Sequence, residues 1–374
     1  FMLGVFGAVP PAAYAVMCLA SSRFVSRAEN GLNWAVFGAC AFIGFYALVP
    51  VTRIPVVCCA ALTAAIASLA LVWPAMHSWI GSDPRPKVRA RHMGLFNIAW
   101  STGYAISPLL AGPLCDWDYR LPYVVLCCLA FAVFLIVRSL PHERDYFGSA
   151  SQELLEERAD HDRASEAHLL SAWCGVMVAS ALNNVVRAIY PQRIADLVAA
   201  NGLRWFCEAA PADILTYAPA TKFSWLASAL AATTALSFVV MGRTERWHHR
   251  FGYRLGLQVA AAGAMWLLVH TESLVLMMAS FTVLGANLGF AFFSGLYYSI
   301  SNPARKHARA AINEGAIGMG GFAGSIVLGH VAGRYGLVVA FEYAPVFVGA
   351  ALVLQALLLW HSKARMPRAG SAPL

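Results

Sequence analysis

Charged side chains are scarce in this chain: Asp, Glu, Lys and Arg make up only 12% of its 374 residues, whereas apolar residues make up 59%. That charged fraction is about half of what an average soluble domain carries. The chain therefore has too few polar residues to cover a single apolar core with a hydrated surface, which excludes an ordinary soluble protein. Its net charge of +8 would suggest a nucleic-acid partner in a soluble protein, but no such partner is expected here.

Motifs for catalysis and cofactor binding are also missing. No Gly-rich loop ends in Gly-Lys-Ser or Gly-Lys-Thr, which argues against ATP-driven transport by this chain. His248 and His249 lie in a basic loop without the acidic or cysteine neighbours of a metal site. We therefore expect no enzyme, no cofactor and no metal. The nine cysteines form no Cys-x-x-Cys pair, and whether Cys115 and Cys207 pair is left open.

Long apolar runs take the place of charge. A run of about 20 apolar residues matches the ~30 Å hydrocarbon core of a bilayer, and a helix pairs all of its backbone groups within the run. The runs are too long and too evenly apolar for barrel strands. The sequence therefore predicts an all-α polytopic membrane protein with eleven spans, at residues 1–20, 34–50, 54–76, 93–114, 121–138, 169–188, 222–241, 255–270, 273–300, 311–333 and 337–360.

The basic residues are distributed unevenly between the two sides of the membrane. If the loop after the first span is cytoplasmic and the sides alternate, 20 of the 27 Lys and Arg residues fall inside. This asymmetry is what the positive-inside rule predicts, so the positive charge reports orientation. We expect a multi-pass protein of the cell (plasma or inner) membrane, with the lipid bilayer as partner and with loops 81–91, 141–168 and 301–309 in the cytoplasm.

A charged segment at 141–168 divides the spans into two groups. Its mixed charges and few apolar residues predict a solvated cytoplasmic connector. We therefore predict an N-terminal helical bundle at 1–140, this connector, and a C-terminal bundle with a short cytoplasmic tail at 169–374. Five spans precede the connector and six follow it, so an even division would need one more helix before Phe1. A second polar segment, 189–221, is predicted on the outside.

The two groups of spans resemble one another. Each contains a basic loop followed by a Gly-rich helix, and an offset of 217 residues superposes Gly103 on Gly320. The same offset superposes Asn97 on Glu314. Internal duplication of a helical bundle is typical of a secondary transporter.

The first Gly-rich helix carries a spaced motif, G-x8-G-x3-S-P-x2-A-G. Its residues are Gly94, Gly103, Ser107, Pro108, Ala111 and Gly112. This motif resembles the fifth-helix pattern of the major facilitator superfamily, which has glycine at Ser107 and Ala111 and is most associated with antiporters. Small residues let helices approach closely, and Pro108 allows a bend. Packing alone explains the motif equally well.

A second resemblance lies in the loop after the first span. Arg23 and Arg27 match basic positions of the family's loop between helices two and three, but its acid is Ser22 here and its glycine is Val25. The charge latch that the family's acid implies is therefore not expected from this loop. The counterpart loop of the second half keeps an acid and is the alternative latch: Arg243, Glu245 and Arg246.

The resemblance covers essentially the whole chain, taken as helices two to twelve of a twelve-helix transporter with two six-helix bundles. It implies a monomeric secondary transporter that moves a small solute by alternating access, with proton-coupled antiport as one form. The alternative is a non-transporting membrane sensor or scaffold that has kept the fold. The altered loop favours that alternative, and the polar side chains within the spans count against it.

Polar side chains within the spans are the candidates for a substrate site, because burying them in hydrocarbon is costly. Several recur at helical spacing on one face, with aromatic rings that would cover the apolar parts of a solute. Their low fixed charge favours a neutral or amphipathic solute. The predicted cavity residues are Asn97, Trp100, Ser101, Tyr104, Asn183, Asn184, Arg187, Asn287, Ser294 and Tyr298.

These candidates have structural alternatives. Interhelical hydrogen bonding explains an Asn or Ser in a span about as often as ligand contact does. Arg187 and Tyr298 lie near predicted span ends, where snorkelling or an aromatic belt is expected.

Glu314 is the predicted proton-coupling residue. It lies early in span 311–333, and it is the repeat counterpart of Asn97. A carboxyl near the membrane interior can load and release a proton as its surroundings change. The alternative is that Glu314 pairs with Arg309 or Arg305.

Overall fold

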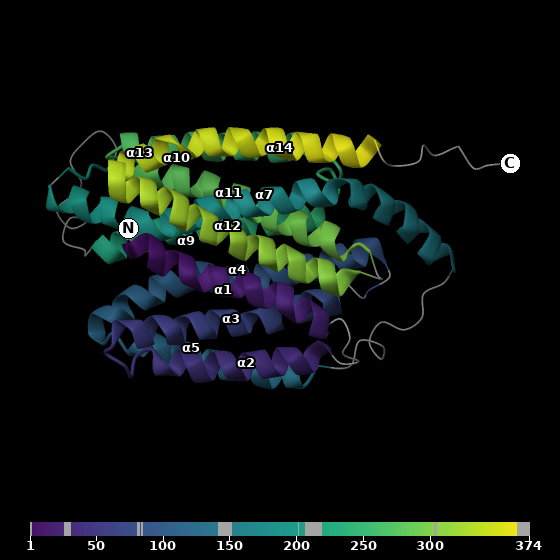
Figure 1. The fold of residues 1–374 in the computed structure, drawn as a ribbon, viewed down its shortest axis with the longest axis horizontal. Coiled ribbons are helices and arrows are strands. Elements are labelled where there is room, and N and C mark those ends of the chain that lie inside the picture. Colours follow the sequence, from purple (N-terminus) through teal and green to yellow (C-terminus); the bar gives the residue numbers. More distant parts are fainter. Residues whose placement is uncertain are drawn as a thin grey trace.

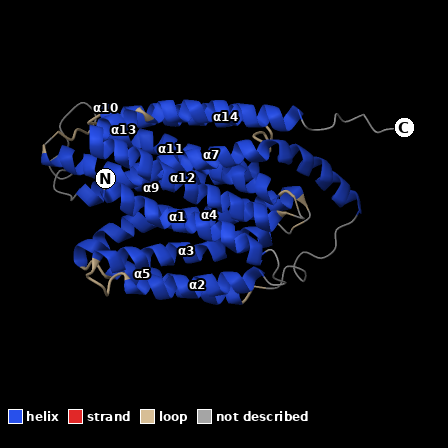
Figure 2. Ribbon diagram, viewed as in Figure 1, coloured by secondary structure: helices blue, strands red, loops and turns tan. Residues whose placement is uncertain are grey.

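A computed structural model of the chain describes residues 2–25, 31–80, 83, 85–140, 152–200, 202–205, 219–302 and 305–364. These residues are helical apart from short connections and one isolated bridge between Arg204 and Ser273. Figures 1 and 2 show long helices that run roughly side by side along the long axis of the molecule. The predicted all-α fold is confirmed.

The helices fall into two groups along the chain. The first bundle contains α1 (Met2–Val25), α2 (Gly31–Leu48), α3 (Pro55–Ile80), α4 (Pro86–Trp117) and α5 (Leu121–Arg138). The second bundle contains α7 (Gln152–Ala199), α9 (Pro219–Arg243), α10 (Phe251–His270), α11 (Leu274–Ile300), α12 (Lys306–Tyr335), α13 (Leu337–Glu342) and α14 (Ala344–Ala364). Because only Tyr343 separates α13 from α14, the two together form the last of the eleven predicted spans.

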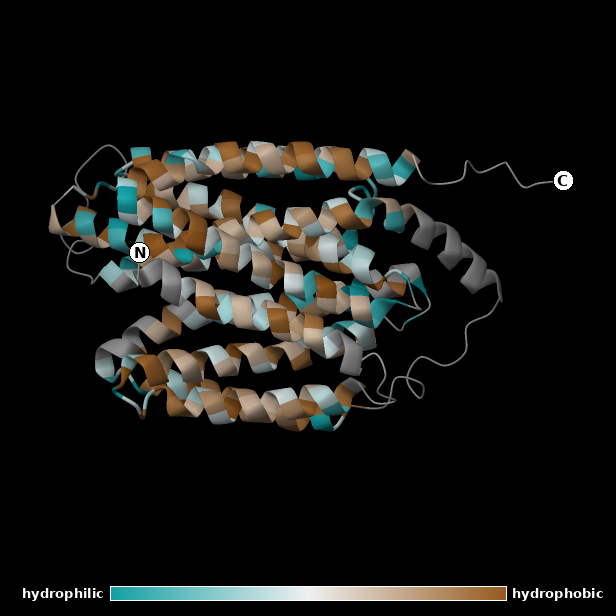
Figure 3. Cartoon of the chain, viewed as in Figure 1, coloured by the Kyte–Doolittle hydropathy of each residue, from teal (hydrophilic) through white to brown (hydrophobic). Residues whose placement is uncertain are grey.

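Seven helical stretches in the described part of the chain are long and apolar enough to cross a membrane: α3, α5, α7, α9, α11, α12, and α13 with α14. Shorter apolar stretches lie in α1 and α2, at Gly7–Ser21 and Leu32–Leu48. The polar residues of α4 lower its hydropathy. Figure 3 shows apolar residues along the middle of the outer helices and hydrophilic residues toward their ends.

The largest departure from the predicted boundaries is α7, which is 48 residues long. It begins at Gln152, inside the predicted connector, and ends at Ala199, inside the predicted outer segment 189–221. The charged stretch stays helical because Glu, Leu, Ala and Arg are all good helix formers. Residues 141–151 of the connector lie outside the described residues.

Two helix pairs join the bundles: α1 packs along α12, and α4 packs along α9. These are the most extensive helix contacts in the molecule, and we call the interface between the bundles the seam. Glycines permit the close approach. A Cβ atom added to Gly94 would lie 3.3 Å from the Cα of Gly242, and one added to Gly318 would lie 2.7 Å from the carbonyl oxygen of Pro11.

The two repeat-related glycines differ in their surroundings. A Cβ atom on Gly320 of α12 would overlap the backbone carbonyl of Met177 on α7. A Cβ atom on Gly103 of α4 would meet nothing within 4 Å. Gly103 is therefore not a tight packing position, in contrast to the prediction from its motif. The surroundings of Pro108 and Gly112 lie outside the described residues.

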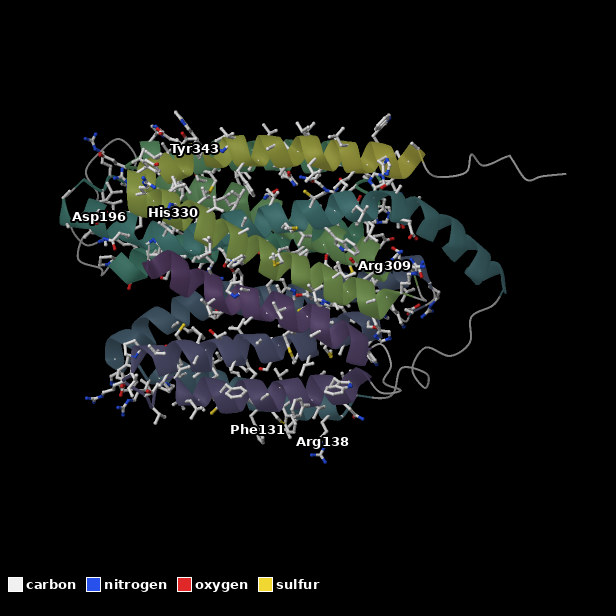
Figure 4. All side chains as sticks on the ribbon, viewed as in Figure 1. Phe131, Arg138, Asp196, Arg309, His330 and Tyr343 are labelled. Atoms are coloured by element: carbon white, nitrogen blue, oxygen red, sulfur yellow. The ribbon has the colours of Figure 1, made fainter. Side chains whose placement is uncertain are left out.

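The basic residues gather at the end of the molecule where α3, α5, α9 and α14 finish. Figure 4 shows Arg309 toward this end and both Asp196 and His330 toward the opposite one. We call the end toward which Arg309 lies the basic end.

Asp83 lies in the loop 81–91 at the basic end and is fully buried. It accepts hydrogen bonds from the backbone and the side chain of Arg85, and these raise the pKa of the Arg85 guanidinium.

The glycine pair gives a matched test of packing. Gly320→Ala should lower the unfolding temperature, because overpacking typically costs ~1–3 kcal/mol. Gly103→Ala should leave it unchanged or raise it, because alanine favours a helix interior over glycine by about 1 kcal/mol. Thermal unfolding of the two purified variants measures this difference, and equal effects at both positions would contradict the assigned surroundings.

Topology is tested by single cysteines on a cysteine-free background. A cysteine at Ser139, at the basic end, should resist an impermeant maleimide added to intact cells. A cysteine at Tyr119, which is 51% exposed in the loop between α4 and α5 at the opposite end, should react. Ready labelling at Ser139 with protection at Tyr119 would reverse the orientation expected from the positive-inside rule.

Candidate functional site

Glu314 of α12 is buried in the seam, with 5% of its surface exposed. The Tyr14 hydroxyl of α1 donates a 2.6 Å hydrogen bond to its Oε2 atom. Nδ1 of His77, on α3, lies 3.3 Å from its Oε1 atom. That contact has ion-pair distance but not hydrogen-bond geometry, so it is an ion pair only when the imidazole is protonated. The carboxylate of the second bundle is thus held by two residues of the first bundle, and we call the three residues the seam triad.

Aromatic rings fix the position of His77. Its ring packs edge-on against Phe96 of α4, with centroids 5.3 Å apart, and lies 6.3 Å from the ring of Trp73. The next residue, Ser78, makes a second polar contact across the seam, 3.1 Å from Nε2 of His307 on α12. Near the basic end, polar contacts therefore join the two bundles, and aromatic rings pack around His77.

Arg309 does not pair with Glu314. Arg309 is 7% exposed, and its guanidinium donates hydrogen bonds to the carboxylate of Glu166, near the start of the apolar part of α7. Both residues belong to the second bundle, so this pair does not cross the seam. The alternative in which Glu314 serves as the partner of Arg309 is therefore wrong.

The predicted latch loop makes no ion pair among the described residues. Glu245 is exposed, and neither it nor Arg243 has an oppositely charged partner in that part of the chain. The two side chains instead line a cavity of about 480 Å³ between α4 and α9, together with Arg91. Arg246 is exposed beside them. Ionic contact between the bundles comes from the seam triad rather than from this loop.

The predicted cavity residues of α4 contact one another and one residue of α7. Asn97 accepts a 3.0 Å hydrogen bond from the indole N–H of Trp100, whose ring lies 5.8 Å from that of Tyr104. The hydroxyl of Tyr104 accepts a hydrogen bond from Arg187 of α7. Ser101 bonds only the backbone of its own helix. Four of these five predicted residues thus form a connected row across the seam.

Two predicted asparagines lie on α7 near this row. The Oδ1 atom of Asn183 is buried without a hydrogen-bond partner. The side-chain amide of Asn184 packs against Gly321 of α12. Asn184 is thus part of the helix interface, whereas Asn183 has unused hydrogen-bonding capacity.

The predicted residues of α11 are separate from this row. Asn287 and Ser294 are buried, and Ser294 bonds the backbone of its own helix. Tyr298 lies near the basic end, where its hydroxyl accepts a hydrogen bond from the backbone N–H of His249. Burial, and to a lesser degree the charge of Lys363, lowers the pKa of His249. Tyr298 thus closes the end of the second bundle and does not contact Tyr104 or Arg187.

Sequence reasoning missed Tyr14 and His77. His77 directly follows the predicted apolar span 54–76, and a histidine at that position was an available signal. Tyr14 had none, since its role depends on the packing of α1 against α12. Some predictions fall outside the described residues: Arg27, Cys207, and the side chains of Arg23 and Cys115.

Comparison with known proteins identifies the architecture. The Major Facilitator Superfamily model matches residues 1–173. The structure is similar to the human organic anion transporter MFSD10 (TETRAN), with a TM-score of 0.65 at 11% identity over 96% of this chain and 82% of that chain. It is also similar to the E. coli fucose:proton symporter FucP, with a TM-score of 0.57 at 12% identity over 96% and 91% of the two chains. No curated protein matches the sequence.

The Arg309 pair generates a stability prediction. Glu166→Gln should lower the unfolding temperature, because it leaves a buried guanidinium without a counter-charge. Breaking a buried pair costs about 3–5 kcal/mol; since Glu166 is 45% exposed, about 1–2 kcal/mol is expected after solvent screening. Glu245→Gln replaces an exposed acid that has no ion pair among the described residues, and it should change the unfolding temperature little. Equal unfolding temperatures for both variants would show that the pair adds no stability.

Proposed function

We propose that this chain is a major facilitator superfamily protein and a secondary transporter that moves a small solute by alternating access, because residues 1–173 match the family model and the fold is similar to those of MFSD10 and FucP. In this mechanism the two bundles rock about the seam and open it to one side of the membrane and then to the other. The helix pairs α1–α12 and α4–α9 are suited to such motion, since small residues let their backbones slide in close contact.

The position of Glu314 carries the proposal of proton coupling. When its carboxylate is charged, attraction to His77 and the hydrogen bond from Tyr14 hold α12 against the first bundle. When it binds a proton, the ionic part of this attraction is lost, and separation of the bundles near the basic end becomes easier. Protonation therefore shifts the balance between the two conformations by its different affinity for each.

Cys18, His307 and Arg309, which are titratable and lie near the seam triad, are not assigned the proton-binding role of Glu314. Cys18 is buried one turn after Tyr14, but a thiol is neutral near neutral pH. His307 faces Ser78 rather than the carboxylate. The charge of Arg309 is balanced by Glu166. Loading and release of a proton in the seam is thus assigned to the Glu314–His77 pair.

We propose antiport as the form of coupling, since the small-residue pattern of α4 resembles the one associated with antiporters. FucP is, by its name, a fucose:proton symporter, so direction needs its own measurement. In proteoliposomes with an internal pH dye, an antiporter releases protons against the solute flux, whereas a symporter takes them up with it. A sensor or scaffold would move neither.

Coupling is tested without knowledge of the substrate. Spin labels at Ser139 of α5 and His361 of α14 report the distance between the bundles at the basic end. In the wild-type chain we expect this distance to increase as the pH is lowered, because a proton on Glu314 removes the ionic part of the attraction across the seam. Glu314→Gln should give the longer distance at every pH, since glutamine keeps size and hydrogen bonding but not charge.

The control is Glu245→Gln, which removes an exposed carboxylate outside the triad and should keep the wild-type response. His77→Gln should weaken the response, because it removes the imidazole that faces the carboxylate. A Glu314→Gln variant whose distances still follow pH as in the wild type would remove Glu314 from coupling.

A further inference from the structure

Arg187 lies in the apolar stretch of α7, which runs from Ala164 to Ala199. The sequence places it near the end of the predicted span 169–188, where snorkelling toward water is one explanation of its charge. Its hydrogen bond and ring contact instead point across the seam to α4.

The guanidinium of Arg187 crosses the seam to α4. Nη1 donates a hydrogen bond to the Tyr104 hydroxyl, and the guanidinium carbon lies 4.6 Å from the centre of the Tyr104 ring. This combination of hydrogen bond and cation–π contact fixes the orientation of the side chain. Tyr104 thus positions the cation between the two bundles.

The cation has no counter-charge in the described part of the chain. No carboxylate there lies within ion-pair distance of Arg187. A guanidinium has five N–H donors, and its one hydrogen bond to a described residue is the bond to Tyr104. The side chain is exposed. Because an unpaired charge within a span is costly, a negative group from outside the protein would stabilise this arrangement.

The surroundings fit a particular kind of anion. Trp100 lies one turn before Tyr104, with ring centroids 5.8 Å apart. The planar guanidinium matches the two oxygens of a carboxylate, and the two rings offer faces for an apolar body.

We propose that Arg187, positioned by Tyr104, binds the carboxylate of a monoanionic organic substrate with an aromatic or aliphatic body. One fixed cation balances one negative charge, so this chemistry suits a carboxylate better than a phosphate dianion. The proposal rests on the proposed transport function, because it names the class of solute carried. It replaces the neutral solute expected from the low charge of the predicted cavity.

Binding of paired probes to the purified chain tests this site. Benzoate and octanoate are compared with their neutral amides, benzamide and octanamide, by calorimetry in detergent. The wild-type chain should bind each carboxylate about tenfold or more tightly than its amide, as expected for charge-assisted hydrogen bonds. Arg187→Gln should abolish that preference, and Arg187→Lys should keep the preference at lower affinity, since lysine keeps the charge without the fork.

Two further variants complete the design. Tyr104→Phe keeps the ring but removes the hydroxyl, and should weaken carboxylate binding about twofold to tenfold; it carries the test if Arg187→Gln does not fold. Arg334→Gln is the matched control. Arg334 also lies over a tyrosine ring, 5.6 Å from the centre of Tyr335, but at the far end of α12, so its loss should not affect binding.

Equal affinity for carboxylates and amides in the wild-type chain, or unchanged preference in Arg187→Gln, would overturn the proposal. This assay uses no membrane and no gradient, so it separates the site from the transport function. Carboxylate binding without any solute movement in proteoliposomes would keep the site and overturn transport. Uptake of a neutral solute without carboxylate preference would keep transport and overturn the site.

Discussion

The cost of placing a charged carboxylate inside a membrane protein is the constraint on which this architecture depends. Glu314 is stable in the seam only while residues of the opposite bundle solvate it, through the Tyr14 hydroxyl and the imidazole of His77. The same contacts therefore decide whether the charge is tolerated and whether the bundles stay together. In the proposed mechanism, coupling between proton and conformation needs no long pathway, since the group that would bind the proton is itself part of the interface.

The duplicated halves have diverged in how they use the same positions. Gly320 lies against the backbone of α7, whereas Gly103 has free space beside it. At another pair of equivalent positions, Asn97 bonds the indole of Trp100 within one helix, and Glu314 reaches across the seam. The second half thus supplies the tight interface and the acid, while the first supplies the aromatic row.

The fold could be predicted from sequence because each span is a local property of about 20 residues, and all eleven have a corresponding helix. The site was harder. Trp100, Tyr104 and Arg187 could be predicted as candidates because polar and aromatic side chains in apolar spans stand out individually. Tyr14, His77 and the true partner of Arg309 depend on which helices pack together and at what register. A repeat motif likewise gave no information about the open space beside Gly103, since small residues mark where contact is permitted and not where it occurs.

The unbroken length of α7 gives this helix a mechanical role. At 48 residues it is about 72 Å long, more than twice the thickness of a hydrocarbon core. Its charged first turns therefore extend beyond the apolar part of the same helix that carries Arg187. A partner bound to those turns outside the bilayer would thus be connected to the seam through one continuous helix.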